Sequence, residues 1–422
     1  MTLICTETYS KQEPASLETY LTLEGYQAWQ KILNNKISKS EIINQIKESG
    51  LRGKGGAGFL TGLKWSFIPI SDEQKYLVCN SDESEPGTCK DRDILRYNPH
   101  AIIEGMLIAS YAIGASVAYN YLRGEFLDEQ WKVFNKALEE AYQKGYVGNN
   151  ILSTGLTINI FPVLGAGAYI VGEETAMLEA IEGKRGMPRI KPPFPAIKGL
   201  FAKPTIINNT ETLATVPKII LKGAEWYKSL GINNGEGVKI FCMSGSVQKP
   251  NNFEVPLGTP FSNLLEMSGG VSNNSKLKAV IPGGSSVPVV KGELMLDTNM
   301  DYDSILKANS MLGSGGVIVM DETICMVKVL QRISRFYYGE SCGQCTPCRE
   351  GTGWLYKILT NIIDGNGTIN DLHELERIAG LIEGHCICAL GDAAALPVKS
   401  FLNNFWDEFE YYIDNKKSMV VG

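Results

Sequence analysis

The most constraining feature of this sequence is a group of cysteines near its C-terminal end. Cys342, Cys345 and Cys348 are spaced at i, i+3 and i+6 in a segment that contains Gly and Pro. Three thiolates at this spacing can surround one compact ion or cluster, and Cys386 or Cys388 can supply a fourth ligand. The spacing favours a [4Fe-4S] cluster. Zinc is the alternative, although zinc sites usually contain paired cysteine knuckles or histidines.

The composition argues against several classes of protein. Hydrophobic residues make up 44% of the 422 residues, which predicts roughly two to four domains with well-filled cores. Lys and Arg number 40 against 46 Asp and Glu, so nucleic acid is not an expected partner. The longest uncharged stretch, 105–122, contains too many polar residues to span a bilayer, and the first residues do not resemble an export signal. We expect a cytosolic protein without direct membrane insertion.

The remaining five cysteines are isolated in the sequence. We expect them to be small buried apolar residues rather than ligands. They are Cys5, Cys79, Cys89, Cys242 and Cys325.

The first half of the chain alternates between strand and helix patterns. Strand patterns occupy 76–80, 116–122 and 156–163, and helix patterns occupy 99–114, about 127–144 and a segment that starts near Glu173. This alternation predicts an open α/β domain with a mostly parallel sheet. Two helices are expected before it, over 16–50. The proline-rich segment 183–204 is expected to be an irregular loop that covers a site.

The pattern changes twice in the second half of the chain. Short strand-like runs around one short helix near 261–267 predict a small α+β module, and the residues after 322 predict a helical bundle. We therefore expect three domains, with boundaries at 1–236, 237–321 and 322–422.

A glycine-rich segment lies before the first predicted strand. Gly53, Gly55 and Gly58 form a literal G-x-G-x-x-G, but a helix precedes it where a dinucleotide fingerprint requires a strand. Glycines still allow backbone amides to approach an anion, and Arg52, Lys54 and Lys64 add positive charge. The segment favours phosphate or flavin contact, with a structural turn as the alternative.

Two groups of acidic residues follow predicted strands. Asp82, Glu83 and Glu85 lie at a strand's carboxyl end, where open α/β sheets bind ligands and carboxylates can accept hydrogen bonds from ribose. A solvated acidic turn is the alternative. Glu173 and Glu174 follow the Gly165–Gly167 turn and are a second candidate group for a ligand. The alternative is that they lie at a helix start and interact favourably with the helix dipole.

The Asn208–Thr212 segment is ambiguous. Asn and Thr are good helix caps, and paired Asn side chains also suit the amide-rich edge of a flavin. The residues alone leave both readings open.

Six motifs together resemble one family, the flavoprotein (NADH-binding) subunit of bacterial NADH:quinone oxidoreductase, respiratory complex I. They are RGKGGAGF at 52–59, CNSDESEPGT at 79–88, GAGAYIVGEETAML at 165–178, KPPFPA at 191–196, KPTIINNTET at 203–212 and ESCGQCTPCREG at 340–351. The resemblance implies a Rossmann-like FMN/NADH-binding domain, a ubiquitin-like (SLBB-type β-grasp) domain and a C-terminal helical bundle that carries a [4Fe-4S] cluster.

The resemblance also implies roles for single residues. FMN would contact Gly53, Gly55, Lys64, Asn80, Asp82, Ser84, Tyr169, Glu173, Ile207, Asn208, Asn209 and Thr212. Phe59, Phe67 and Phe194 would hold the adenine of NADH, with Glu85, Tyr169, Glu174 and Lys191 lining the rest of its pocket. The cluster ligands would be Cys342, Cys345, Cys348 and Cys388, although Cys386 competes for the fourth place.

The implied activity is hydride transfer from NADH to FMN, followed by single electrons to the cluster. The implied partners are a [2Fe-2S] thioredoxin-like subunit and a large multi-cluster iron-sulfur subunit, in a peripheral arm on the cytoplasmic side of a membrane-bound complex. Flavin subunits of NAD-linked hydrogenases or formate dehydrogenases share these motifs and are the nearest alternative. A non-catalytic assembly scaffold with a structural zinc is the alternative from outside the enzymes.

Overall fold

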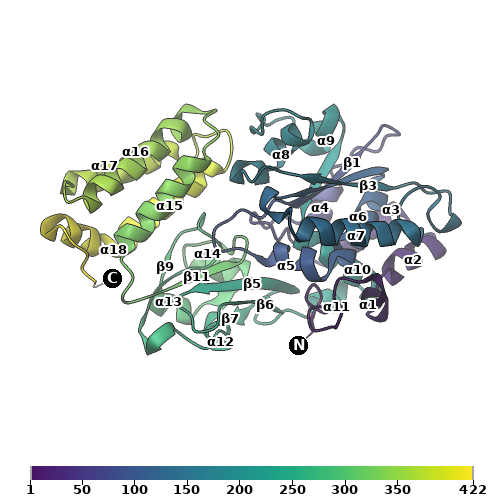
Figure 1. Cartoon of the computed structure of the whole chain (residues 1–422), viewed down its shortest axis with the longest axis horizontal. Coiled ribbons are helices and arrows are strands. Elements are labelled where there is room, and N and C mark those ends of the chain that lie inside the picture. Colours follow the sequence, from purple (N-terminus) through teal and green to yellow (C-terminus); the bar gives the residue numbers. More distant parts are fainter. Residues whose placement is uncertain (1, 421–422) are drawn as a thin grey trace.

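The computed structural model describes residues 2–420, and its elements form three groups (Figure 1). The N-terminal group contains three helices, α1 (Leu17–Thr22), α2 (Gln27–Asn34) and α3 (Lys39–Glu48), where two were predicted. The extra break lies before α2, where Glu24 and Tyr26 have positive φ. The Tyr26 ring stacks on Tyr146 with ring centroids 4.0 Å apart. A contact distant in sequence therefore holds the break between α1 and α2, which the helix propensities of the neighbouring residues do not predict.

A parallel sheet forms the centre of this first group. Its strands are β1 (Tyr76–Ser81), β2 (Val117–Leu122), β3 (Asn159–Leu164) and β4 (Thr205–Asn209), in the order β3-β2-β1-β4. All three neighbouring pairs are parallel, which confirms the predicted α/β class. The carboxyl ends of β1 and β4 therefore lie side by side, and their residues reach the same edge.

Helices cover the sheet and connect its strands. They are α4 (Thr61–Trp65), α5 (Lys90–Tyr97), α6 (Pro99–Ile113), α7 (Gln130–Gln143), α8 (Glu174–Ile181), α9 (Pro195–Lys198), α10 (Thr210–Lys222) and α11 (Ala224–Lys228). Helix α6 is buried along nearly its whole length and packs on α10. Helix α5 was not predicted because its sequence is mostly charged. The segment 183–204 is not a wholly irregular loop, since it contains α9 and the one-turn helix η4 (Leu200–Ala202).

A second sheet follows in the chain. It contains β6 (Asn251–Pro256), β5 (Val238–Gly245), β11 (Gly316–Asp321), β8 (Leu277–Ile281) and β9 (Val290–Lys291), in that spatial order. Only β5 and β11 pair in parallel. The strands β7 (Thr259–Pro260) and β10 (Asn299–Met300) form a separate pair. Three helices accompany these strands where one was predicted: α12 (Phe261–Met267), α13 (Gly292–Leu296) and α14 (Tyr302–Lys307).

Four helices complete the chain and pack together at one end of the molecule (Figure 1). They are α15 (Met326–Glu340), α16 (Thr346–Ile363), α17 (Ile369–Ile382) and α18 (Leu390–Asn415). Their apolar faces share one core with Val78 and Ile207 of the parallel sheet. Among residues 2–420, no helix is both long and apolar enough to cross a membrane.

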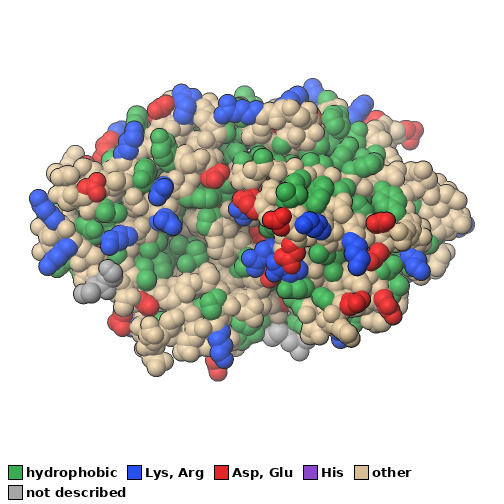
Figure 2. Space-filling model, in the orientation of Figure 1, with side chains coloured by type: hydrophobic (Ala, Val, Ile, Leu, Met, Phe, Trp, Pro, Cys, Tyr) green, Lys and Arg blue, Asp and Glu red, His purple; other side chains and the backbone are tan. Residues whose placement is uncertain are grey.

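The face of the molecule shown in Figure 2 mixes charges of both signs with apolar side chains. A dense group of Lys, Arg, Asp and Glu side chains lies near its centre, and no region of a single sign dominates that face.

Candidate active site

A cleft of ≈ 560 Å³ opens where the three groups of elements meet. It lies at the carboxyl ends of β1 and β4, the edge at which open α/β sheets bind ligands. Eight of the residues that the resemblance implied for FMN or NADH line it, and the acidic candidate Glu83 lines it as well; the eight are Gly55, Asn80, Asp82, Ser84, Glu85, Tyr169, Glu173 and Asn209. The second sheet unit contributes Ser286 and Ser314, and the bundle contributes Leu390. The sequence did not indicate these last contributions, because they come from other folding units.

Other residues expected at the flavin lie beside the cleft rather than on its wall. Thr212 accepts a hydrogen bond from the backbone N–H of Lys54 at 2.9 Å, and Asn208 accepts one from the Trp65 indole at 2.8 Å. Ile207 is buried in β4. Gly53 donates its N–H to the carbonyl of Phe59 at 2.8 Å, so it closes the base of the glycine-rich loop. Their contact with a flavin stays a prediction.

The glycine-rich loop reaches the cleft through its backbone at Gly55 and Gly56. Gly58 has φ +64°, a conformation that side chains rarely adopt. A Cβ on Gly55 would lie only 3.0 Å from the Cβ of Asn209. Glycine therefore allows this backbone to lie close to β4 and leaves its amides near a ligand.

The cationic side chains of this loop do not point into the cleft, where we expected them to add positive charge for an anionic ligand. Lys54 is buried beneath the loop, with its Nζ 2.8 Å from Thr215 Oγ1 and 3.4 Å from Glu211 Oε1. Arg52 donates to the carbonyl of Gly58 at 3.2 Å and lies over the Tyr302 ring. Neither lysine nor arginine adds a free charge to the cleft here, because each already has a partner.

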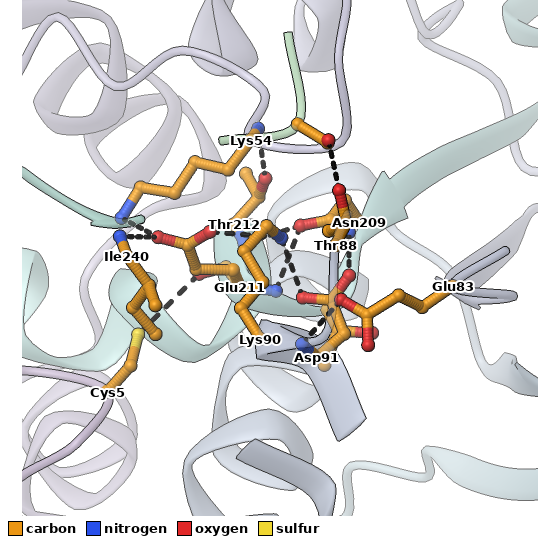
Figure 3. A network of polar contacts seen from close by, with 12 residues as sticks. Cys5, Lys54, Glu83, Thr88, Lys90, Asp91, Asn209, Glu211, Thr212 and Ile240 are labelled. Atoms are coloured by element: carbon orange, nitrogen blue, oxygen red, sulfur yellow. Dashed lines mark hydrogen bonds and ion pairs between the residues drawn. The ribbon is translucent and has the colours of Figure 1, made fainter. Parts of the chain in front are cut away.

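A buried ionic network lies under the cleft (Figure 3). Glu211 is fully buried, and its Oε2 lies 3.0 Å from Lys90 Nζ and 3.8 Å from Lys239 Nζ. Burial alone would raise the pKa of Glu211, but the lysines around it lower that pKa to about 2. Burial lowers the pKa of Lys239 to about 8. Sequence reasoning missed this network, since charged residues are normally assigned to the surface.

Lys90 and Asp91 connect this network to the cleft wall. Lys90 Nζ donates to Asp91 Oδ1 at 2.8 Å, and Asn209 Nδ2 donates to Asp91 Oδ2 at 2.6 Å. Asn209 also caps α10, because its side chain accepts the backbone N–H of Glu211 and Thr212. Capping is thus confirmed for Asn209, and its side chain lies at the cleft as well.

The acidic segment after β1 is largely buried, which contradicts the solvated-turn reading. Glu83 accepts the backbone N–H groups of Asp91 at 2.8 Å and Arg92 at 2.9 Å. Asp82 lines the cleft, and its Oδ2 is buried without a hydrogen-bond partner. Burial raises the pKa of Asp82 to about 7. A buried acceptor without a partner, at the wall of a cleft, suits a ligand that supplies a hydrogen-bond donor.

Glu85 joins two units across the cleft. It accepts the Tyr169 hydroxyl at 2.7 Å and the backbone N–H of Ser286 at 2.8 Å. Burial raises the pKa of Glu85, while these hydrogen bonds oppose that shift. Tyr169 lies in the one-turn helix η3 (Tyr169–Gly172), which follows the Gly165–Gly167 turn.

The residues expected to bind the nucleotide include three exposed aromatic side chains and a group of paired charges, which we call the nucleotide patch. Phe59, Phe67 and Phe194 are 48%, 48% and 57% exposed, and the rings of Phe59 and Phe67 have centroids 6.1 Å apart. Exposed aromatic faces of this kind can hold a planar base.

The charged part of the patch contains two acids and two lysines. Glu174 lies 3.0 Å from Lys64 and 3.1 Å from Lys191, and Glu173 lies 2.7 Å from Lys191. Burial alone would raise the pKa of Glu174, but the two lysines lower it. Glu173 also caps α8 by accepting the backbone N–H groups of Thr175 and Ala176.

The predicted cluster thiols converge on a second, smaller pocket. Cys342, Cys345, Cys348 and Cys388 line it, together with Ile170 and Leu390. Four sulfur donors are the ligand set that a [4Fe-4S] cluster takes. In the described part of the chain, no three His, Cys, Asp or Glu side chains are close enough to enclose a single ion.

Cys386 does not line that pocket. Its Sγ lies 3.5 Å from the carbonyl oxygen of Ile382, and a Cβ on Gly391 would overlap it. Among the cysteines expected to be isolated, Cys5, Cys79, Cys242 and Cys325 are buried. Cys89 is only partly buried, and its backbone N–H points at Cys242 Sγ at 3.3 Å. These two cysteines are therefore neighbours, which their sequence separation hides.

Comparison with known proteins agrees with this geometry. Residues 46–218 match the Nuo51 FMN-binding domain, 240–290 match the SLBB domain, and 328–412 match the NADH-ubiquinone oxidoreductase-F iron-sulfur binding region. These matches confirm the predicted FMN and [4Fe-4S] cofactors.

A solved structure of an NAD+-reducing [NiFe]-hydrogenase in the H2-reduced state aligns with a TM-score of 0.83 at 32% identity. The alignment covers 97% of this chain, and this chain spans 66% of the length of that one.

Curated relatives are more similar still. The NADH-quinone oxidoreductase F subunit of Rickettsia bellii (strain OSU 85-389) is 52% identical over 383 residues, 90% of this chain and 91% of its own. The same subunit of Rickettsia typhi is 53% identical over 377 residues, 89% of each chain. The predicted family and enzyme class are confirmed, and the chain belongs to the family of the NADH-quinone oxidoreductase F subunit.

Proposed function

We propose that this chain oxidises NADH in the cleft and passes the electrons, by way of FMN and a [4Fe-4S] cluster, to partner subunits that reduce quinone. One observation carries the placement of these sites: the cleft and the thiol pocket share Ile170 and Leu390 as lining residues. The two places therefore lie next to each other, with the apolar side chains of Ile170 and Leu390 between them. Bound FMN would accept a hydride and release single electrons.

Residues on the cleft wall would hold the flavin. The glycine-rich backbone at Gly55 leaves room for close approach, Asn80 and Asp82 present polar atoms, and Asn209 supplies an amide. The remaining residues of the proposed FMN set are Gly53, Lys64, Ser84, Tyr169, Glu173, Ile207, Asn208 and Thr212. The protein's contribution is to align nicotinamide and flavin, because close orientation of two reactants can supply about 7–11 kcal/mol of the barrier.

The nucleotide patch would hold NADH. Phe59, Phe67 and Phe194 offer faces to the adenine, and the ion-paired Glu174 and Lys191 offer polar groups to the ribose and phosphates. Glu85 and Tyr169 would complete this pocket from the cleft side.

Cys342, Cys345, Cys348 and Cys388 would bind the cluster. EPR spectroscopy of the NADH-reduced protein tests this placement. Cys348→Ala should abolish the cluster signal and retain the flavin absorbance, because the thiol pocket and the flavin cleft have largely separate walls. Cys325→Ala, at a buried cysteine of the same bundle, is the matched control and should keep both. A Cys348→Ala spectrum identical to that of the wild type would refute the ligand assignment.

Absorbance spectroscopy distinguishes the proposed oxidoreductase from a zinc-containing assembly scaffold. A purified, colourless chain that contains zinc would be a scaffold, whereas flavin and iron-sulfur bands identify the oxidoreductase. The hydrogenase alternative is weaker, since relatives at 52% identity are named as quinone-reducing subunits.

The partners proposed are the [2Fe-2S] thioredoxin-like subunit and the large multi-cluster subunit, in a peripheral arm on the cytoplasmic side of the membrane. The relatives are named as one lettered subunit of an oxidoreductase, which supports an assembly of several subunits. The proposed domain boundaries are 1–236, 237–321 and 322–422. Each sheet falls within one of these ranges, and the four long C-terminal helices fall within the third.

A further inference from the structure

Glu340 connects the segment that carries the thiols to the cleft. It is the last residue of α15, and Cys342 follows two positions later. Its Oε2 accepts the backbone N–H of Tyr169 at 3.0 Å. Tyr169 lines the cleft and begins η3, where a helical N–H has no partner within its own helix. One hydrogen bond thus joins the end of α15 to the cleft wall.

Aromatic contacts strengthen the same junction. The Tyr169 ring lies edge-on to Phe336 and Tyr337 of α15, with centroid distances of 5.1 and 6.0 Å. Tyr337 is fully buried, and its hydroxyl lies 3.0 Å from Ser285 Oγ in the second sheet unit. The end of α15 is therefore held against the cleft wall over one helical turn.

The position of Glu340 is unfavourable for the helix itself. A carboxylate at a helix C-terminus opposes the helix dipole, and within residues 2–420 Glu340 forms no ion pair that would offset this effect. Its one polar contact in that range is the hydrogen bond to Tyr169. A side chain that does not stabilise its own helix is thus used to hold the neighbouring unit.

We propose that Glu340 is a positioning residue, which holds Tyr169 and the thiol segment in a fixed relation and so sets the rate of electron transfer from flavin to cluster. This inference rests on the proposed function. Ile170, the residue after Tyr169, lines both the cleft and the thiol pocket. Loosening the Tyr169 backbone would therefore move the wall between the two sites, whereas Phe59 and Glu174 have side-chain contacts of their own with Phe67, Lys64 and Lys191.

Three variants of the full-length protein test the proposal. Glu340→Ala removes the hydrogen-bond acceptor. Glu340→Gln replaces the carboxylate by an amide whose oxygen can still accept the Tyr169 N–H. Glu350→Ala is the matched control, since Glu350 lies equally close in sequence to a thiol but its side chain is 48% exposed and pairs with the neighbouring Arg349. Stopped-flow bleaching of the flavin band after addition of NADH measures hydride transfer, and freeze-quench EPR measures cluster reduction. Hydrogen exchange followed by mass spectrometry measures protection of the Tyr169 amide.

Glu340→Ala should accelerate exchange at Tyr169 by about tenfold or more, the effect expected when a hydrogen bond to a charged group is lost. It should slow cluster reduction by about tenfold and slow flavin bleaching less, because the wall between the two sites loses its alignment while most of the proposed flavin pocket keeps its own contacts. Glu340→Gln should restore both measurements, and Glu350→Ala should change neither.

Equal slowing of bleaching and cluster reduction in Glu340→Ala would show a general structural defect and overturn the proposal. Unchanged exchange and cluster reduction, or a Glu340→Gln variant that behaves like Glu340→Ala, would also overturn it. A wild-type chain without flavin or cluster signals would instead refute the proposed function, and with it the role in electron transfer. The exchange measurement needs neither cofactor, so the two failures can be told apart.

Discussion

The buried charge of Glu211 should be one of the largest single contributions to the stability of this protein. Glu211 Oε1 accepts the backbone N–H of Ile240 on β5 at 2.9 Å and lies 3.4 Å from Lys54 Nζ. With Lys90 and Lys239 also near it, its carboxylate joins the first domain to the second sheet. Glu211→Gln should leave buried ammonium groups without their main counter-charge, and removing one partner of a buried pair costs about 3–5 kcal/mol.

The pKa of Glu211 gives a similar magnitude. Burial raises it, and Lys90, Lys239 and Lys54 lower it from 4.5 to about 2. A carboxyl with these folded and unfolded values contributes about 3 kcal/mol of stability. Because the folded pKa is the lower one, the contribution is complete above about pH 4.5 and is lost as the pH falls toward 2. The Gln variant should lack this acid-dependent loss.

Urea unfolding followed by circular dichroism, at pH 7 and at intervals down to pH 3, measures both effects. Glu225→Gln is the matched control, because that glutamate is 86% exposed and its ion pair with Lys228 lies at the surface; it should change stability by less than about 0.5 kcal/mol. Adding Lys239→Met to Glu211→Gln should recover part of the loss, since the double variant removes one of the stranded charges. A Glu211→Gln protein within about 1 kcal/mol of the wild type, with the same acid dependence, would refute this account.

Three further predictions concern nucleotide choice, cluster ligation and packing. Glu174→Ala should raise the NADPH/NADH ratio of kcat/KM by about tenfold, because two lysines then face one remaining acid and an unpaired Lys64 can attract the 2′-phosphate at a gain of about 1.4 kcal/mol. Steady-state kinetics with ferricyanide as the electron acceptor measure this ratio, and Glu179→Gln on the same helix is the control. Equal weakening of both nucleotides would place Glu174 outside the ribose pocket. Cys388→Ser should abolish the cluster EPR signal and Cys386→Ser should not, because Cys388 lines the thiol pocket and Cys386 does not; the reverse result would reassign the fourth ligand. Gly105→Ala should lower stability by about 1–3 kcal/mol, because its Cβ would overlap the carbonyl of Leu213 on α10. Gly380→Ala adds a Cβ in open space and should raise stability by up to about 1 kcal/mol. Thermal unfolding compares the two variants, and equal effects would contradict the packing argument.

Local patterns in the sequence were sufficient for the features that depend on neighbouring residues. Alternation of strand patterns with helix patterns predicted the parallel α/β class, and Pro99 and Gly114 marked the ends of α6 within one residue. The Cys342–Cys348 spacing predicted a thiol site, and three of its members line one pocket. A helix cap was one of two readings for Asn208–Thr212, and Asn209 does cap α10. Each of these signals is carried by backbone geometry over a few residues, which a single sequence displays directly.

The tertiary structure alone decided which of these pieces meet. Lys54 looked like a cation for an anionic ligand, yet it is buried against Glu211, which lies 157 positions later in the chain. The contact between Cys89 and Cys242 and the bond between Glu340 and Tyr169 were equally hidden. Charged side chains carry no periodic signal when they are buried in pairs, because their partners come from distant elements. Only the folded chain, by excluding water around such groups, determines whether a charge serves a ligand or holds two units together.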